Sequence, residues 1–425
     1  MDRYAAVPVI SKGSACFRFR LMAAALILAA CGAPPETADT VRSVDTNRVP
    51  AVTEAAADMS SSEHRALAER FRRTLERLVE EDGLPGAVAA YALPTGRLGV
   101  AGEGFADIES GARMGPHHRM LAGSIGKTFV AATVLSVAAQ GLVNLDAPVS
   151  TYLDEQAFAA LSSWERITIR HLLTHSAGLR DHVDDEDFGA LVGGLLERGD
   201  PDASIDPPAL VGTILNDPAL FEPGAGYSYT DTGYILLGLV IEEVTGGTYY
   251  DELQRRILDP LELEQTSPSE RHAPYLATGY LESNNIFGLP ERVVEDGAMI
   301  LNPAVEWTGG GLISNPADLV AWARALYRGE ALPTPYLNDL LGSVVKRSPE
   351  DTGGYGLGVF INDTELGRTY GHPGWFPGYN SIVAYYPNWD IAVAIQINRD
   401  FGNRLGHYRD ELARVVMAAL SVEAP

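Results

Sequence analysis

Residues 122–135 read AGSIGKTFVAATVL, and this stretch decides the fold. Ser124 and Lys127 stand three positions apart in it, ahead of an apolar run that predicts a buried helix closing at Gly141. Positions i and i+3 share a helix face, so we expect the lysine ammonium beside the serine hydroxyl. A helix N-terminus favours developing negative charge, and an enclosed lysine can act as a base. The pattern predicts a nucleophilic serine with its base; the alternative is a serine N-cap beside a surface lysine.

Strand patterns occur near both ends of the chain. Residues 86–93 and 97–105 are strand-like segments on either side of the turn PTG, which predicts a hairpin. Residues 380–386 and 391–397 repeat this pattern near the C-terminus, with a Pro-Asn turn between them.

Helices are expected around and between these strands. Apolar side chains recur at helical spacing in residues 62–81, and a last helix is expected over residues 403–420. The middle, approximately residues 125–304, is mainly helical and rich in loops, and its acidic stretch 181–187 is expected to be solvated. We therefore predict an α+β fold, in which an antiparallel sheet from both chain ends is flanked by helices and carries an inserted, mainly helical lobe. A site is expected in a cleft between these parts.

The N-terminus has the layout of a secretory signal. Two arginines precede an apolar run at residues 21–30, which is too short to cross a bilayer. The run ends in LAAC, which resembles a bacterial lipobox and implies cleavage before Cys31 and lipid on its thiol. The alternatives are a plain signal peptide with an incidental cysteine and a buried N-terminal helix.

These features divide the chain into three parts. We expect a lipoprotein signal peptide at residues 1–30, a disordered tether at 31–61 and one folded domain at 62–425. They also predict an exported protein anchored by lipid to the cell membrane, on the periplasmic side of the outer membrane in a Gram-negative cell. The mature chain would form no internal disulfide, because Cys16 would leave with the signal.

The composition excludes other classes of protein. Of the 425 residues, 46% are hydrophobic and 21% are charged, which is typical of a globular chain. The net charge of −24 repels phosphate backbones, so no nucleic-acid partner is expected. The histidines lack the spacing of metal ligands, and we expect no metal site and no cofactor.

Several sequence blocks, in order, resemble the serine β-lactamase and D,D-peptidase superfamily, near the class C enzymes and the secreted carboxypeptidases. They are GSIGKTF (123–129), ITIRHLLTHSAGL (167–179), YSYTDTGY (227–234), GGGLIS (309–314) and GHPG (371–374). The resemblance covers roughly residues 63–420. It implies the fold described above and a serine hydrolase that acts through an acyl-enzyme on a small-molecule or peptide substrate.

The resemblance also implies roles for individual residues. Ser124, Lys127 and Tyr229 would be catalytic, and Asp231, His372, Gly374 and Trp375 would support them or contact substrate. The Tyr229 phenol would relay the serine proton to the leaving group; the alternative is a buried aromatic with a satisfied hydroxyl. The backbone N–H groups of Ser124 and Trp375 would form an oxyanion hole, and Gly374 would let substrate lie against its strand.

Two of these residues depart from the family pattern. His372 replaces a common lysine and is often neutral near pH 7, so it would hold a substrate carboxylate less firmly. Asp231 stands where asparagine is usual, and a carboxylate only accepts hydrogen bonds. It either faces Lys127 or caps a local turn. Esters, D-amino-acid peptides and β-lactams remain open as substrates, and the departures favour ester or amide hydrolysis over a dedicated β-lactamase.

Two alternative functions remain. AGSIG resembles the nucleophile elbow of an α/β-hydrolase, but that motif needs a buried strand before the serine, and GPHHR at 115–119 is a poor strand. A catalytically weak or inactive envelope-binding protein on the same fold is the other alternative. The sequence leaves the oligomeric state open.

Overall fold

The computed structural model describes residues 48–197, 199–200, 202–285, 288–400 and 404–421. The predicted signal peptide, Cys31 and the tether up to residue 47 lie outside these residues. Within them, no helix is long and apolar enough to cross a membrane.

The two ends of the described chain meet in one antiparallel sheet of eight strands. Its order is β3–β2–β1–β13–β12–β11–β10–β9. The strands are β1 (Gly86–Ala92), β2 (Leu98–Asp107), β3 (Ala112–Arg113), β9 (Gly354–Tyr355), β10 (Phe360–Thr364), β11 (Gly367–Phe376), β12 (Tyr379–Tyr386) and β13 (Ile391–Ile397). The junction lies where Ala87 pairs with Ile397 and Ala92 with Ala392. The sheet confirms the predicted α+β fold and excludes the α/β-hydrolase alternative, whose sheet is mostly parallel.

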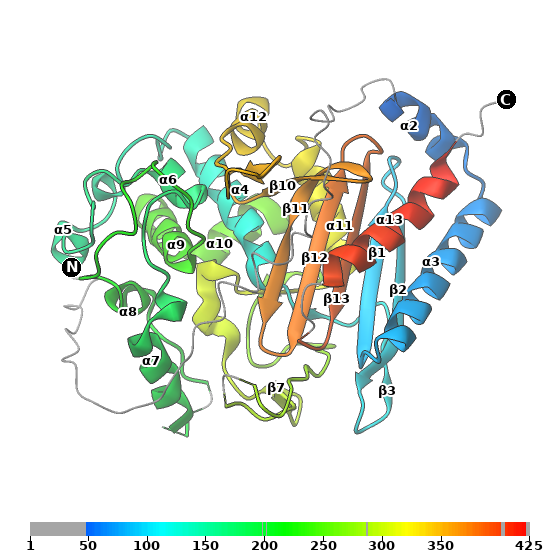
Figure 1. The fold of residues 1–425 in the computed structure, drawn as a ribbon, viewed down its shortest axis with the longest axis horizontal. Helices are drawn as coiled ribbons and strands as arrows, with labels where there is room; N and C mark the ends of the chain where they lie inside the picture. Colours follow the sequence, from blue (N-terminus) through cyan, green and yellow to red (C-terminus); the bar gives the residue numbers. More distant parts are fainter. Residues whose placement is uncertain (1–47, 198, 201, 286–287, 401–403, 422–425) are drawn as a thin grey trace.

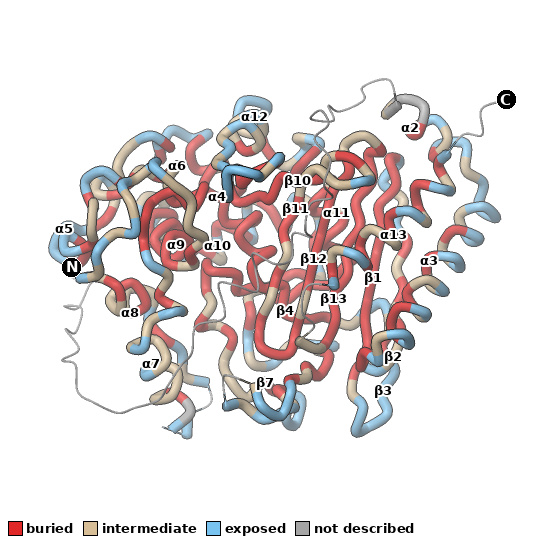
Figure 2. The backbone as a smooth tube through the Cα atoms, viewed as in Figure 1, coloured by how far each residue is buried: buried red, intermediate tan, exposed pale blue. Residues whose placement is uncertain are grey.

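Helices cover both faces of this sheet. On one face lie α3 (Ser61–Glu81) and α13 (Leu405–Leu420), and on the other lies α11 (Pro316–Tyr327) (Figure 1). Every residue of β1 and β13 is therefore buried, which explains why both strands read as nearly continuous apolar runs. Figure 2 shows this buried centre between the exposed outer sides of the helices.

Helix α3 begins where its sequence predicts. The Ser60 side chain accepts a hydrogen bond from the Glu63 N–H, and Glu63 returns one to the Ser60 N–H, which forms a capping box. Its buried face consists of leucine, phenylalanine and valine at helical spacing, and it packs on β1 and β2.

The tether prediction is wrong for residues 48–58. They form helix α2 (Arg48–Asp58), which lies against α13. The segment has few large apolar residues, and its composition therefore indicated disorder. Val52 and Ala56, one turn apart, are nevertheless buried in the core between α3, α13 and the sheet, and this is enough to dock a short helix.

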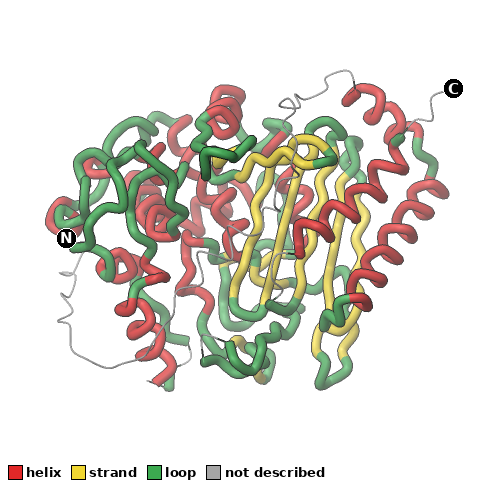
Figure 3. The backbone as a smooth tube through the Cα atoms, viewed as in Figure 1, coloured by secondary structure: helices red, strands yellow, loops and turns green. Residues whose placement is uncertain are grey.

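The middle of the chain forms a mainly helical lobe beside the sheet (Figure 3). Its α-helices are α4 (Gly126–Ala139), α5 (Glu155–Phe158), α6 (Ile169–Leu173), α7 (Glu186–Glu197), α8 (Pro207–Gly212), α9 (Asp231–Thr245) and α10 (Tyr249–Leu253). Short 3₁₀ segments are η1 (Gly123–Ile125), η2 (Val149–Thr151), η3 (His182–Asp184) and η5 (Pro303–Gly309), and η4 (Gln254–Leu258) is a short π-helix. Helix α12 (Thr334–Gly342) lies between α11 and β9 in the chain. Helix α4 is apolar all round and buried along most of its length, so it is the central helix of the lobe.

Two small sheets complete the structure. The first pairs β4 (Met120–Leu121), β8 (Leu312–Ser314) and β5 (Ser267–Pro268), and the second pairs β6 (Val294–Glu295) with β7 (Ala298–Met299). Because β4 leads directly into η1, its pairing with β8 brings the glycine segment at 309–311 close to Ser124.

The docking of α2 can be tested at Val52. A Val52→Asp substitution should release the helix, because it replaces a buried apolar contact of about 2 kcal/mol with a carboxylate. Hydrogen exchange of the amides at 48–58 should then accelerate roughly 30-fold, with little change in the melting temperature of the domain. Glu54→Gln, at an exposed position of the same helix, is the control. Exchange in the native protein already at the rate of an unstructured peptide would contradict the docking.

Candidate active site

Ser124 and Lys127 lie together at the start of α4. Ser124 belongs to the turn η1, and Lys127 is the second residue of the helix. The Lys127 Nζ donates a hydrogen bond to the Ser124 Oγ over 3.1 Å and another to the carbonyl of Gly309. Lys127 is fully buried, and 7% of Ser124 is exposed. The predicted contact is therefore present, and the alternative of a surface lysine is wrong.

Glycines let strand β11 approach this turn closely. Gly123 has a φ of +52°, and a Cβ there would stand 2.5 Å from the backbone nitrogen of Trp375. A Cβ on Gly374 would stand 1.9 Å from the carbonyl oxygen of Ala122. Glycine is thus needed at 374 for contact between β11 and η1. The predicted role of Gly374, the close approach of substrate, stays a prediction beside this packing role.

One edge of β11 is open to the turn. Strand β10 pairs with residues 367–371 of β11, whereas β12 pairs with residues 370–376. Among the described strands, β12 pairs with residues 372–376 on one side and no strand pairs with them on the other. The backbone of Trp375 therefore lies against the glycine that precedes Ser124. This approach is consistent with the predicted oxyanion hole, in which the N–H groups of Ser124 and Trp375 would bind one oxyanion.

The Trp375 side chain is held from the end of β13. Its indole Nε1 donates to the Asp400 carboxylate over 2.8 Å, and the Gly378 N–H donates to the same oxygen over 3.3 Å. Burial raises the pKa of Asp400 to about 6, although both hydrogen bonds oppose that shift. Asp400 thus fixes both the tryptophan and the turn that follows it.

Tyr229 lies directly before α9, close to the lysine. The Lys127 Nζ is 5.0 Å from the centre of its ring. The phenol oxygen is buried and makes no hydrogen bond of good geometry to a described residue. Burial, and then the Asp231 carboxylate, raise the pKa of Tyr229 well above its usual value, and a contact with the Ser124 hydroxyl lowers it. At neutral pH the phenol is therefore protonated.

Asp231 faces the lysine. Its Oδ1 is 2.5 Å from the Lys127 Nζ, and its side chain is 24% exposed. The N-terminus of α9 is capped by Thr230, whose hydroxyl accepts from the Thr232 N–H over 3.1 Å. Of the two predicted alternatives for Asp231, the structure supports the contact with Lys127.

The first two residues of the acidic stretch 181–187 are largely buried, so the prediction of a solvated loop is wrong for them. Asp181 has a side chain only 10% exposed and accepts from the Asp231 N–H over 3.0 Å, and His182 is buried. Burial and the Asp231 carboxylate raise the pKa of Asp181 well above its usual value. The same two causes raise the pKa of Glu306 to about 8. No local pattern predicts these neighbours, because they are 50 or more positions from Lys127 in the sequence.

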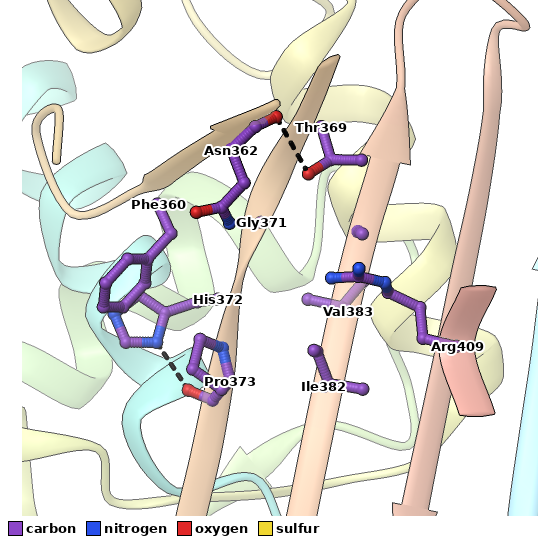
Figure 4. A pocket seen from close by; sticks show the side chains of 10 residues that line it. Phe360, Asn362, Thr369, Gly371, His372, Pro373, Ile382, Val383 and Arg409 are labelled. Atoms are coloured by element: carbon purple, nitrogen blue, oxygen red, sulfur yellow. Dashed lines mark hydrogen bonds between the residues drawn. The ribbon is translucent and has the colours of Figure 1, made fainter. Parts of the chain in front are cut away.

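His372 is buried on β11. Its Nδ1 donates to the Pro373 carbonyl over 2.5 Å, and its Nε2 accepts from the Tyr355 hydroxyl over 3.0 Å. Burial lowers the pKa of His372 to about 3, helped by the charge of Lys127. The imidazole is therefore neutral and supplies no positive charge. A hollow beside it, lined by residues of β10 to β12 and by Arg409, contains neither Ser124 nor Lys127 (Figure 4).

The part of the chain that the structure describes contains no group of three or more His, Cys, Asp or Glu side chains arranged to hold a metal ion. The chemistry available at this site is that of a serine hydroxyl, a lysine, a phenol and backbone donors. Such a set fits acyl transfer through a covalent intermediate.

Comparison with known proteins gives consistent relatives. The Beta-lactamase family profile matches residues 71–418. Penicillin-binding protein 4* of Bacillus subtilis (strain 168) is 26% identical to this chain over 274 residues. The aligned region covers 62% of this chain and 57% of that protein. The teichoic acid D-alanine hydrolase of Staphylococcus aureus (strain NCTC 8325 / PS 47) is 24% identical over 352 residues, 80% of this chain and 78% of that protein. The crystal structure of a D-stereospecific amidohydrolase from Streptomyces sp. has a TM-score of 0.69 and 30% identity, over 83% of this chain and 98% of that one.

Because the profile covers most of its length, the chain belongs to the Beta-lactamase family. The predicted resemblance is confirmed. With these relatives, the chain is a serine hydrolase.

The pair of Asp231 and Lys127 should be visible in the pH dependence. Asp231→Asn removes the carboxylate that pairs with the Lys127 ammonium. If the active form carries that ammonium, the alkaline limb of the kcat/KM profile should move to lower pH by about one unit. Asp187→Asn, on α7 and outside this contact, is the control and should leave the profile unchanged. An unmoved alkaline limb in Asp231→Asn would contradict the coupling.

Proposed function

We propose that the protein hydrolyses an ester or amide through an acyl-enzyme formed on Ser124. The observation that carries this proposal is the buried hydrogen bond between the Lys127 Nζ and the Ser124 Oγ. A lysine enclosed beside a serine at the start of a helix is the arrangement that activates such a nucleophile. The approach of β11 supports an oxyanion hole made by the N–H groups of Ser124 and Trp375.

Tyr229 moves the proton in this scheme. Because its pKa is high, the phenol is not a preformed phenolate base. It takes the Ser124 proton only as it gives its own proton to the leaving group, so the two transfers are coupled. Lys127, paired with Asp231, stabilises negative charge on the oxygens between which the proton moves. In deacylation the same groups act in reverse on a water molecule.

The charges at the site favour a particular substrate class. His372 is neutral, so it offers no partner for a substrate carboxylate. Burial, and then the Asp231 carboxylate, raise the pKa values of Asp181 and Glu306, so these two acids are mostly protonated near neutral pH and add little negative charge. The Asp231 side chain is 24% exposed, and its carboxylate suits a substrate ammonium better than a substrate carboxylate. The relatives named as a teichoic acid D-alanine hydrolase and as a D-stereospecific amidohydrolase support the same choice. We propose a D-aminoacyl ester or amide with a free amino group as the substrate.

We further propose that the protein acts in the cell envelope and is held there by lipid on Cys31. The LAAC sequence that ends at Cys31 and the names of the two bacterial relatives support this location. A D-aminoacyl group on a wall polymer would be accessible to an enzyme anchored in this way.

The acyl-enzyme can be observed directly. After treatment with a fluorophosphonate, intact-mass analysis should show one adduct on the native protein and none on Ser124→Ala. Lys127→Ala should label at least 100-fold more slowly, because removal of the activating group costs about 3 kcal/mol in the transition state. Labelling that persists in Ser124→Ala would contradict the assignment. A native protein that takes no adduct would favour the alternative of an inactive binding protein.

The substrate class can be tested with paired esters. The p-nitrophenyl ester of D-alanine should have a kcat/KM roughly tenfold or more above that of its N-acetyl form, a difference of about 1.4 kcal/mol for the ammonium contact. Nitrocefin and a D-Ala-D-Ala peptide, each with a carboxylate, should react more slowly than the free-amine ester. A preference for the N-acetyl ester or for nitrocefin would overturn this substrate class and leave the nucleophile untouched.

The lipid anchor has a separate test. Cys31→Ser should move the protein from the membrane fraction to the soluble fraction, because the lipid supplies the membrane affinity. Cys16→Ser is the matched control and should remain with the membrane. A native protein that is already soluble would contradict the lipoprotein proposal.

A further inference from the structure

His175 packs against Tyr229 and, among the described residues, makes no hydrogen bond to Ser124. It follows α6 by two residues and is fully buried. Its φ is +54°, in the left-handed region, where histidine is among the few non-glycine residues that are enriched. A strained backbone conformation is kept only where the surrounding structure determines it, and it is frequent at functional sites.

Two hydrogen bonds join His175 to both neighbours of Tyr229. Its carbonyl oxygen accepts from the Ser228 N–H over 2.9 Å, and its Nδ1 accepts from the Thr230 N–H over 3.2 Å. The backbone of Tyr229 is therefore held from both sides by one residue.

The imidazole also packs against the phenol ring. The ring centres of His175 and Tyr229 are 4.1 Å apart, with an angle of 34° between the planes. On its other sides the imidazole lies 5.1 Å from the ring of Tyr234 and 4.6 Å from that of Tyr355. The hydroxyl of Tyr355 in turn bonds to His372, so the aromatic packing connects the lobe to β11.

The protonation of His175 follows from these contacts. Because Nδ1 accepts a backbone hydrogen bond, the neutral ring carries its proton on Nε2. Burial, followed by the charge of Lys127, lowers the pKa of His175 well below its usual value. One nitrogen is occupied by Thr230 and the other carries the proton, so His175 has no free lone pair with which to act as a base.

We propose that His175 is a positioning residue, which holds the Tyr229 phenol at the Ser124–Lys127 pair. The inference rests on the proposed function of Tyr229 in proton transfer. The phenol oxygen makes no well-formed hydrogen bond of its own to a described residue. Its place therefore depends on the backbone of Tyr229 and on the packing of its ring, and His175 contributes to both. A small displacement of a proton-transfer group costs rate far more than it costs binding.

Two substitutions at His175 separate its two contacts. His175→Asn keeps a side-chain acceptor for Thr230 and tolerates the left-handed backbone, but it removes the ring. His175→Phe keeps an aromatic face but leaves the Thr230 N–H buried without its partner. We expect each to lower kcat by roughly 10- to 100-fold, with KM changed by about twofold or less. His171→Asn is the control. This histidine lies in the same block, accepts from the Thr168 N–H at the start of α6, and should leave kcat unchanged.

The decisive measurement repeats His175→Asn and His175→Phe in a Tyr229→Phe background. If His175 acts through the Tyr229 hydroxyl, its substitution should lower kcat there by about twofold or less. A general structural role would give the same loss in both backgrounds, and that result would overturn the proposal. Unchanged kcat in folded His175→Asn or His175→Phe would overturn it too. Fluorophosphonate labelling of Ser124 is measured in parallel. A native protein that does not label refutes the proposed function, whereas a native protein that labels beside fully active His175 variants refutes this inference alone.

Discussion

The structure depends on one buried ammonium group. Lys127 has no exposed surface, and its Nζ is surrounded by the Asp231 carboxylate, the Gly309 carbonyl and the Ser124 hydroxyl. Burying an unpaired lysine is unfavourable by several kcal/mol, and removing one partner of a buried pair typically costs about 3–5 kcal/mol. Segments far apart in the sequence must therefore meet at this point. The contacts that surround Lys127 therefore also hold the helical lobe against the sheet.

Close contact between backbone segments also restricts the geometry of the site. The turn η1, the glycine segment at 309–311 and strand β11 approach so closely that a Cβ on Gly123, Gly310 or Gly374 would overlap backbone atoms. These contacts leave the donors at Ser124 and Trp375 little freedom, because each is flanked by packed main chain. Oxyanion donors contribute most when they are fixed before the reaction, so the tight packing has a chemical consequence.

Local sequence patterns predict the features of the fold and the site that depend on residues close together in the sequence. β1 and β13 appear as apolar runs because both of their faces are covered, and the S-x-x-K spacing places Lys127 beside Ser124 because the segment is helical. The remaining features depend on tertiary contacts. Helix α2 docks through two small side chains, Asp181 reaches Asp231 across 50 positions, and His175 reaches Tyr229 across 54. No local periodicity records such pairs, and the composition of 48–58 favoured disorder.

The protonation states at the site restrict the path of the serine proton. His175 and His372 are neutral with strongly lowered pKa values, and Tyr229 is protonated with a raised one. None of the three is a ready base at neutral pH. The proton must therefore pass to Lys127 or move through the phenol in a coupled transfer. Asp231, by pairing with the lysine, favours its ammonium form and so favours the coupled path. In the mechanism proposed above, the carboxylate at position 231 therefore decides whether Lys127 or Tyr229 carries the serine proton.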